Sequence, residues 1–166
     1  MNKLAEGTRR WTAVFFTDMA NFSAVTEALG SERTYQLISR VVEIAVSAVE
    51  RHGGKPLNFA GDSLLASFGA PQALEDAALQ ACRASLEFQQ KLQNECDRLD
   101  REFGARPEFR VGISGGMVVM GRMGLESKMD LNIMGAPVNE AARLEALAEP
   151  GQILLSDAVA AQAEGW

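Results

Sequence analysis

Short strand-like runs alternate with long amphipathic segments along this chain, and their order is the feature that most limits its possible folds. The run 11–17, WTAVFFT, is apolar and rich in aromatic and β-branched residues, which predicts a buried strand. Similar runs predict the remaining strands at 55–60, 63–68, 109–113, 117–120, 130–134 and 153–155. Apolar residues at helical spacing predict helices at 23–51, 75–103 and 138–148, with a short helix after the last strand.

Two glycine-containing turns complete the expected topology. Gly61-Asp62 and Gly115-Gly116 each separate two short strand-like runs, and such pairs are typical of hairpin turns. The order is therefore strand, helix, hairpin, helix, hairpin, strand, helix, strand. Mixed strands with the helices on one face indicate an α+β fold with a ferredoxin-like mixed sheet.

Length and charge restrict the class of protein further. A chain of 166 residues with 47% hydrophobic and 23% charged residues is expected to form one globular domain. We assign residues 1–10 to an N-terminal extension and residues 11–166 to that domain. Its 16 basic and 22 acidic side chains give a net charge of −6, so no excess of positive charge favours binding to a nucleic acid. Carboxylates can still recruit Mg²⁺, which in turn binds a nucleoside triphosphate.

The cysteine, histidine and apolar-run patterns argue against several other classes. Cys82 and Cys96 lie in one predicted helix, about 21 Å apart along its axis, and cannot pair there. His52 is the single histidine, so no zinc ligand set is expected. No run reaches the roughly 18 apolar residues of a membrane span. We therefore expect a reduced, cytoplasmic domain without membrane contact in this segment.

Two aspartates are the first candidates for chemistry. Asp18 follows the predicted strand 11–17 and precedes a helix, where an aspartate commonly caps the helix. Asp62 lies in the hairpin turn, where aspartate is common for conformational reasons alone. In a ferredoxin-like sheet, however, the first strand neighbours that hairpin, so both carboxylates could share one edge. Two such carboxylates repel each other unless a cation such as Mg²⁺ or Mn²⁺ lies between them.

Backbone and side-chain groups elsewhere could complete a phosphate site. At the start of the helix after Asp18, a phosphate is expected to bind the free backbone amides of Met19, Ala20, Asn21, Phe22 and Ser23. Asn139 and Arg143 are four residues apart and share one helical face. Such a pair could orient a ribose and neutralise charge on a transferring phosphate, although an exposed Asn and Arg pair is more often simply solvated.

Four motifs occur in an order and spacing that resemble a known family. They are FFTDMANFS, HGGKPLNFAGDSLLASFGAP, FRVGISGGMVVMG and IMGAPVNEAARLEALAEPGQILLSD, spread over residues 11–159. Together they resemble the catalytic domain of class III nucleotidyl cyclases. The resemblance implies a head-to-tail homodimer that converts a nucleoside triphosphate to a 3′,5′-cyclic nucleotide and pyrophosphate. It also implies two Mg²⁺ or Mn²⁺ ions at each of two interfacial sites, with half of each site from each chain.

The resemblance implies roles for the candidate residues by motif position. Asp18 and Asp62 match the two metal-binding aspartates, and Met19 matches the residue whose carbonyl joins the second ion. Asn139 and Arg143 match the pair that the opposite chain contributes to stabilise the transition state. Two-metal chemistry agrees with these roles, because the ribose 3′-oxygen must be activated and the leaving pyrophosphate neutralised.

Three further positions concern the substrate. Arg110 matches an arginine that binds the triphosphate, and Asn58 and Asn132 match the two positions that read the base. Adenylyl cyclases typically carry Lys and Asp or Thr there, and guanylyl cyclases Glu and Cys. An Asn carboxamide both donates and accepts, and neither position has the acid expected for guanine, so we rank ATP first and GTP or a pyrimidine nucleotide second. The usual C-terminal strand pair of the family, with its phosphate-binding lysine, has no counterpart before Trp166.

Two other readings remain open beside an active enzyme. One is a degenerate cyclase-homology domain that only dimerises or senses a nucleotide. The other is a diguanylate-cyclase-like domain with similar metal chemistry, although the turn at Gly61-Asp62 lacks the two adjacent acids expected there. The joint presence of Asp18 and Asp62 with Asn139 and Arg143 favours the enzyme.

Overall fold

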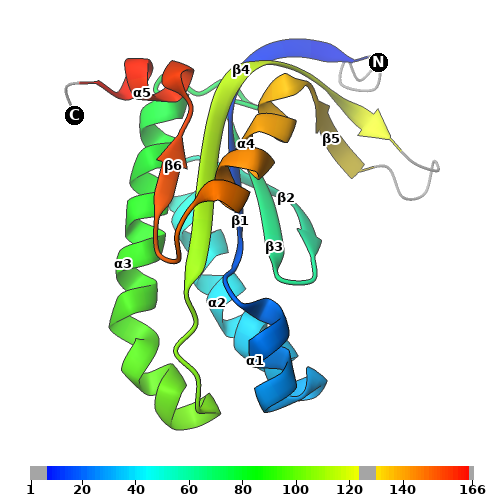
Figure 1. Ribbon diagram of the computed structural model, residues 1–166. Helices are drawn as coiled ribbons and strands as arrows, with labels where there is room; N and C mark the ends of the chain where they lie inside the picture. The colour runs from blue at the N-terminus through cyan, green and yellow to red at the C-terminus, as the bar shows by residue number, and fades with distance from the viewer. Residues whose placement is uncertain (1–6, 124–129, 165–166) are drawn as a thin grey trace.

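The chain folds into one mixed sheet with helices on both faces (Figure 1). The computed structural model describes residues 7–123 and 130–164. Its elements are β1 (Thr8–Met19), α1 (Phe22–Leu29), α2 (Ser31–Arg51), β2 (Lys55–Ala60), β3 (Ser63–Phe68), α3 (Ala77–Phe103), β4 (Phe109–Met123), β5 (Asp130–Met134), α4 (Ala136–Leu147), β6 (Ile153–Leu155) and α5 (Asp157–Ala163).

The sheet has the strand order β2-β3-β1-β4-β5, and β6 adds to β4 in parallel. The strands along the path pair antiparallel, and the order of the first four is that of a ferredoxin-like sheet. The predicted α+β class with a ferredoxin-like mixed sheet is therefore confirmed. The hairpin of β2 and β3 has the predicted bounds, and β1 lies between that hairpin and β4.

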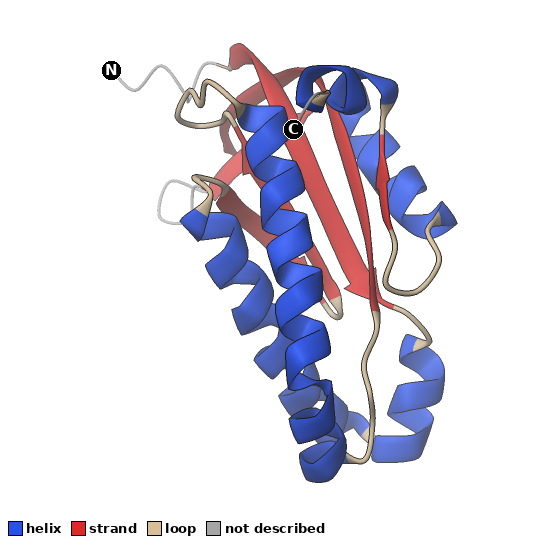
Figure 2. Cartoon of the chain, turned by 90° about the vertical axis from the view of Figure 1, so that its left-hand side faces the viewer, coloured by secondary structure: helices blue, strands red, loops and turns tan. Residues whose placement is uncertain are grey.

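The helices occupy two layers, which corrects the expectation that they share one face. Side chains alternate along β1, so Phe15 packs in the core beneath α2 and α3, whereas Val14 packs against Ala141 of α4 on the opposite face. Figure 2 shows the two long helices side by side against one face of the sheet. The short helices α1 and α5 pack with them in the same cluster, so α4 alone of the described helices covers the other face. Apolar residues on both faces of β1 explain why its middle, residues 13–16, is an unbroken hydrophobic run.

The predicted hairpin at Gly115-Gly116 is wrong. The residues 109–123 form one strand, and both glycines pair with β1 inside it. They serve close packing instead, because a Cβ on Gly115 would lie 2.7 Å from the Trp11 ring and one on Gly116 would lie 3.0 Å from Pro137. Glycine in a strand interior thus marks close approach of neighbouring groups here, and not a turn.

Other boundaries also differ from the sequence expectation. The predicted helix 23–51 is two helices, α1 and α2, separated at Gly30, whose φ of +83° interrupts the helical path. β1 begins at Thr8, so residues 8–10, which we assigned to the N-terminal extension, pair with β4. Cys82 and Cys96 are both free and lie in α3, as expected. Among the described helices, none is long and apolar enough to cross a membrane.

Candidate active site

Asp18 is held beside Arg110 by the pairing of two central strands. The two residues are direct partners in the antiparallel ladder of β1 and β4. Arg110 donates to the Asp18 Oδ1 atom from Nη2 at 3.0 Å and from Nε at 3.3 Å. The helix that follows is capped by Asn21, so Asp18 is not the N-cap residue. Its carboxylate therefore pairs with the Arg110 guanidinium and remains 19% exposed at the end of the sheet.

Asp62 reaches the same end of the sheet from the tip of the β2–β3 hairpin. Its Oδ2 atom accepts a hydrogen bond of 3.1 Å from the backbone N–H of Met19. Burial raises the pKa of Asp62 above its ordinary value, and the Asp18 charge raises it further, whereas backbone N–H groups lower it. The effect of Asp18 on Asp62 indicates that the two predicted carboxylates lie within electrostatic reach of each other.

Glu145 is a third acid in this cluster, and the sequence analysis did not single it out. It lies on α4 with its side chain only 4% exposed, and its Oε1 atom is 3.2 Å from the Arg110 Nε. Burial, followed by a hydrogen bond and charge repulsion from Asp18, raises the pKa of Glu145 to about 8. The sequence does hold one signal for the burial of Glu145. It lies four residues after Ala141, and residues four apart share a helix face, here the face that packs on the sheet.

Gly112 lets α4 come close enough to bring Glu145 into the cluster. A Cβ at this position in β4 would overlap the carbonyl of Ala141 and the backbone N–H of Glu145. Only glycine permits such an approach of a helix backbone to a strand. The glycine two residues after Arg110 thus determines where the third carboxyl group lies.

The donor set of this cluster fits a hard divalent cation. The cluster has three acidic side chains, Asp18, Asp62 and Glu145, to one guanidinium, and repulsion from Asp18 contributes to the raised pKa of Asp62 and of Glu145, which a divalent cation would lower. In the described ranges, no group of three His, Cys, Asp or Glu side chains is arranged as a preformed metal cage. Mg²⁺ does not need one, because it commonly binds one or two carboxylates together with substrate phosphates and water.

The expected cradle of free amides at 19–23 requires correction. The N–H of Met19 donates to Asp62, and the N–H of Ala20 donates to the carbonyl of Glu108 at 2.8 Å. Two of the five amides are therefore engaged within the chain. Asn21, Phe22 and Ser23 lie at the start of α1, where backbone N–H groups have no acceptor within the helix.

Asn139 and Arg143 lie on α4, but not on the face that carries Glu145. Both side chains are exposed. Arg143 precedes Glu145 by two residues, which corresponds to about 200° around the helix. It lines a cavity of about 450 Å³ with Gly116, Glu140 and Asp157. One chain therefore presents Glu145 to its own carboxylate cluster and presents Asn139 and Arg143 away from it.

Asn58 and Asn132 are exposed and lie on strands at opposite ends of the sheet order. Asn58 is on β2, next to an irregularity in the ladder between Pro56 and Asn58, and Asn132 is on β5. Three strands separate them along the sheet path. Neighbouring strands of one chain therefore do not bring the two carboxamides together.

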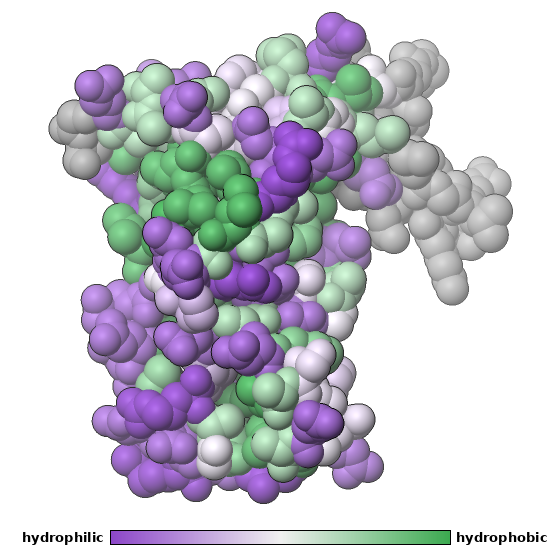
Figure 3. Space-filling view, viewed as in Figure 1, coloured by the Kyte–Doolittle hydropathy of each residue, from purple (hydrophilic) through white to green (hydrophobic). Residues whose placement is uncertain are grey.

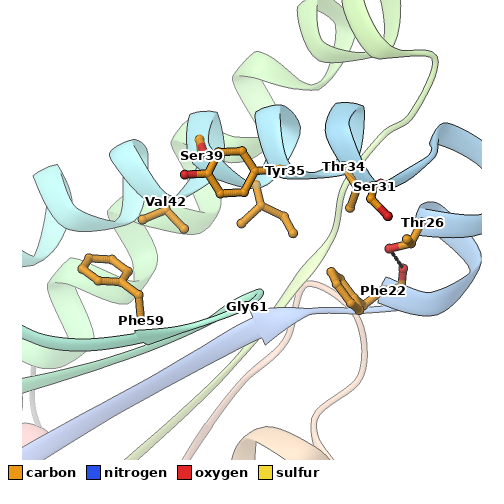
Figure 4. A pocket seen from close by; sticks show the side chains of 10 residues that line it. Phe22, Thr26, Ser31, Thr34, Tyr35, Ser39, Val42, Phe59 and Gly61 are labelled. Atoms are coloured by element: carbon orange, nitrogen blue, oxygen red, sulfur yellow. Dashed lines mark hydrogen bonds between the residues drawn. The ribbon is translucent and has the colours of Figure 1, made fainter.

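A cavity of about 410 Å³ opens beside the tip of the β2–β3 hairpin (Figure 4). Gly61, the residue before Asp62, lines it together with Phe22 of α1. Two exposed aromatic side chains border it, Tyr35 at 73% and Phe59 at 53% exposure. A largely apolar surface therefore adjoins the carboxylate cluster.

The raised pKa of Glu145 predicts a pH dependence of stability. The unfolded carboxyl titrates near 4.5 and the folded one near 8, so the folded state binds more protons between these values. The stabilisation is fully present below 4.5 and is lost as the pH rises through about 8, and Asp62 acts in the same direction. Denaturant unfolding in the presence of a chelator should show a free energy of unfolding that falls as the pH rises. Glu145→Gln should reduce the slope of this pH dependence. An unchanged slope in that variant would contradict the assignment.

Comparison with known proteins identifies the family. A model of the adenylate and guanylate cyclase catalytic domain matches residues 7–164. The chain therefore belongs to the family of adenylate and guanylate cyclase catalytic domains. Uncharacterized proteins of Mycobacterium tuberculosis and Mycobacterium bovis are 36% identical to it over 157 residues, which is 90% of this chain. The chain spans 27% of the length of these relatives.

Solved structures show the same fold. The guanylyl cyclase Cya2 has a TM-score of 0.90 and 29% identity, over 95% of this chain and 80% of that one. The adenylyl cyclase CyaB from P. aeruginosa has a TM-score of 0.88 and 26% identity, over 94% and 81% of the two chains. A bacterial light-regulated adenylyl cyclase has a TM-score of 0.84 and 28% identity, over 98% and 47%. The fold is thus shared with cyclases of both base specificities.

Proposed function

We propose that this domain is a homodimeric nucleotidyl cyclase, with ATP as preferred substrate. The observation that carries the proposal is the division of residues within one chain. Asp18 and Asp62 share one end of the sheet with Arg110, whereas Asn139 and Arg143 face away from them on α4. A site that needs both groups must therefore combine two chains, in the way that the family resemblance implies.

The proposed reaction is attack of the ribose 3′-oxygen on the α-phosphorus with loss of pyrophosphate. Bound Mg²⁺ or Mn²⁺ ions would lower the pKa of the 3′-hydroxyl and neutralise the leaving group. Asp18, Asp62 and the Met19 carbonyl would hold those ions, and Arg110 would bind the triphosphate. Asn139 of the second chain would orient the ribose, and its Arg143 would neutralise charge that develops at the α-phosphate. The protein thus mainly positions the reacting groups in line.

Exposed apolar surface supports the homodimer. Tyr35 and Phe59 line the cavity that includes Gly61 at the hairpin tip, and a second patch covers β6 and the adjoining turn of α4 (Figure 3). Leu147 and Leu155 are exposed in that second region. Large exposed apolar side chains that gather on a surface are typical of protein contact sites. The second patch includes Leu147 on the helix that carries Arg143, which supports a dimer contact close to the proposed Arg143 half-site.

The preference for adenine rests on the uncharged amide groups of Asn58 and Asn132. Neither offers the carboxylate that would pair with the N–H groups of guanine, and each can flip to exchange donor and acceptor. Strong selectivity arises when a wrong base leaves buried polar groups unpaired, at about 1–3 kcal/mol each. A flipped carboxamide avoids part of that cost. ATP is therefore the proposed substrate, with weaker cyclisation of GTP or a pyrimidine triphosphate.

The test is incubation with the four ribonucleoside triphosphates in competition, with Mg²⁺ or Mn²⁺ and identification of the cyclic product. We expect cyclic AMP to dominate with measurable side products. The double change Asn58→Lys with Asn132→Asp should raise the ATP preference at least about tenfold. Stringent selectivity in the parent, or no response to the double change, would remove both residues from the base pocket. Nucleotide binding without any cyclic product would favour a sensing domain instead.

A further inference from the structure

Glu145 is buried in the cluster, yet the proposed mechanism gives it no task. We infer that Glu145 is a positioning residue that holds the Arg110 guanidinium at the metal-binding half of the site, an inference that rests on the proposed function. Helix α4 then serves two sites at once, its own chain's through Glu145 and the partner chain's through Arg143. The contacts of Arg110 and the orientation of α4 carry this inference.

Arg110 has two acidic partners, and they differ in exposure. Its Nε lies 3.2 Å from Glu145 Oε1 and 3.3 Å from Asp18 Oδ1, and its Nη2 extends to Asp18 Oδ1 at 3.0 Å. Asp18 is the more exposed of the two and is the one expected to engage a cation. Once it does, Glu145 remains beside Nε, and Nη2 is released from Asp18 to bind a phosphate. A guanidinium binds phosphate well only when its planar fork is held in orientation.

The burial of Glu145 suits a fixed anchor. Its Oε1 is enclosed and makes no well-aligned hydrogen bond with any described residue, and the Arg110 Nε lies 3.2 Å from it. Its backbone is fixed by the close approach of α4 to Gly112. An anchor with so little freedom can restrict Arg110 far more than a solvated acid could.

The orientation of α4 makes the inference testable in mixed dimers. Glu145 acts within the half-site of Asp18, whereas Arg143 acts in the half-site of the other chain. A chain with Glu145→Met lacks the carboxylate but keeps the volume, so it should lose its metal half and retain its Arg143 half. Such a chain should be rescued by an Arg143→Ala chain and should not be rescued by an Asp18→Ala chain.

The experiment uses Glu145→Met, Glu145→Gln and the exposed control Glu149→Ala. We expect Glu145→Met to lower cyclic nucleotide formation about a hundredfold, because a misplaced Arg110 no longer aligns the triphosphate. Glu145→Gln keeps an acceptor at the same position and should stay within about threefold of the parent. Mixed with Arg143→Ala under subunit exchange, Glu145→Met should recover about a quarter of parental activity. Rescue by Asp18→Ala instead would show that Glu145 supports the outward face of α4, and would overturn the inference.

A binding measurement gives a readout independent of turnover. Calorimetry with tripolyphosphate should show about tenfold weaker binding in Glu145→Met than in the parent or in Glu149→Ala. Equal affinity in all three proteins overturns the inference even if the parent cyclises no nucleotide, so the two failures can be separated. Should Glu145→Met not fold, Glu145→Asp replaces it, because its shorter side chain withdraws the carboxylate from Arg110. The same loss of affinity and the same pattern of rescue are then expected.

Discussion

Replacing Asp18 or Asp62 by alanine is expected to lower cyclic nucleotide formation by at least about a thousandfold. Either change removes one of the two side-chain ligands that the proposed metal site contains. Turnover at saturating triphosphate, together with Mn²⁺ binding followed by calorimetry, measures the effect. Both the rate and the metal affinity should fall in the same variants.

The fold should survive these substitutions. The two carboxylates repel each other, and burial raises the pKa of Asp62, so removal of one acid relieves an unfavourable interaction. Asp62→Ala also loses the hydrogen bond from Met19, which costs about 1 kcal/mol. Asp97→Ala is a matched control, because this exposed aspartate forms a surface ion pair with Arg106, away from the carboxylate cluster. A folded Asp18 or Asp62 variant that turned over like the control would show that the metal assignment is wrong.

Mixing an Asp18→Ala chain with an Arg143→Ala chain is expected to restore activity that neither chain has alone. Each homodimer lacks one half of both sites, and loss of Arg143 alone should cost about 10²–10³ in rate. In the mixed dimer, one site inherits two damaged halves and the other inherits two intact halves. Equal mixing with full exchange yields half heterodimers with one working site each, so about a quarter of parental activity should return.

The control for this result is a direct measurement of subunit exchange between the two variants. Mass spectrometry of differently labelled chains, or energy transfer between them, establishes that heterodimers form. Mixing Asp18→Ala with Asp62→Ala should give no rescue, because both changes damage the same half-site. If exchange is complete and the first mixture stays inactive, each site lies within a single chain. That outcome would contradict the argument drawn from the two faces of α4.

Local patterns in the sequence were sufficient for most elements and for part of the site. The hairpin 55–68 has its predicted strand bounds because alternating strand residues and a Gly-Asp turn are both short-range signals. Asp18 and Asp62 could be paired in advance because the ferredoxin-like order makes their strands neighbours. Glycine was ambiguous as a signal, because both a tight turn and the close packing of a neighbouring group against the backbone require it. The turn interpretation therefore held at Gly61 and was wrong at Gly115-Gly116.

The sequence by itself determined the family of folds, the two carboxylates at the strand ends and the four-residue spacing of Asn139 and Arg143. Only the tertiary structure decided which way α4 faces, and hence that Glu145 joins Asp18 and Arg110 while Arg143 points away. It also decided that the amides of Met19 and Ala20 are engaged within the chain. The physical reason is the range of the interactions. Hydrophobic spacing and turn preferences act over a few residues, whereas the partners of a buried charge come from strands and helices far apart in the chain.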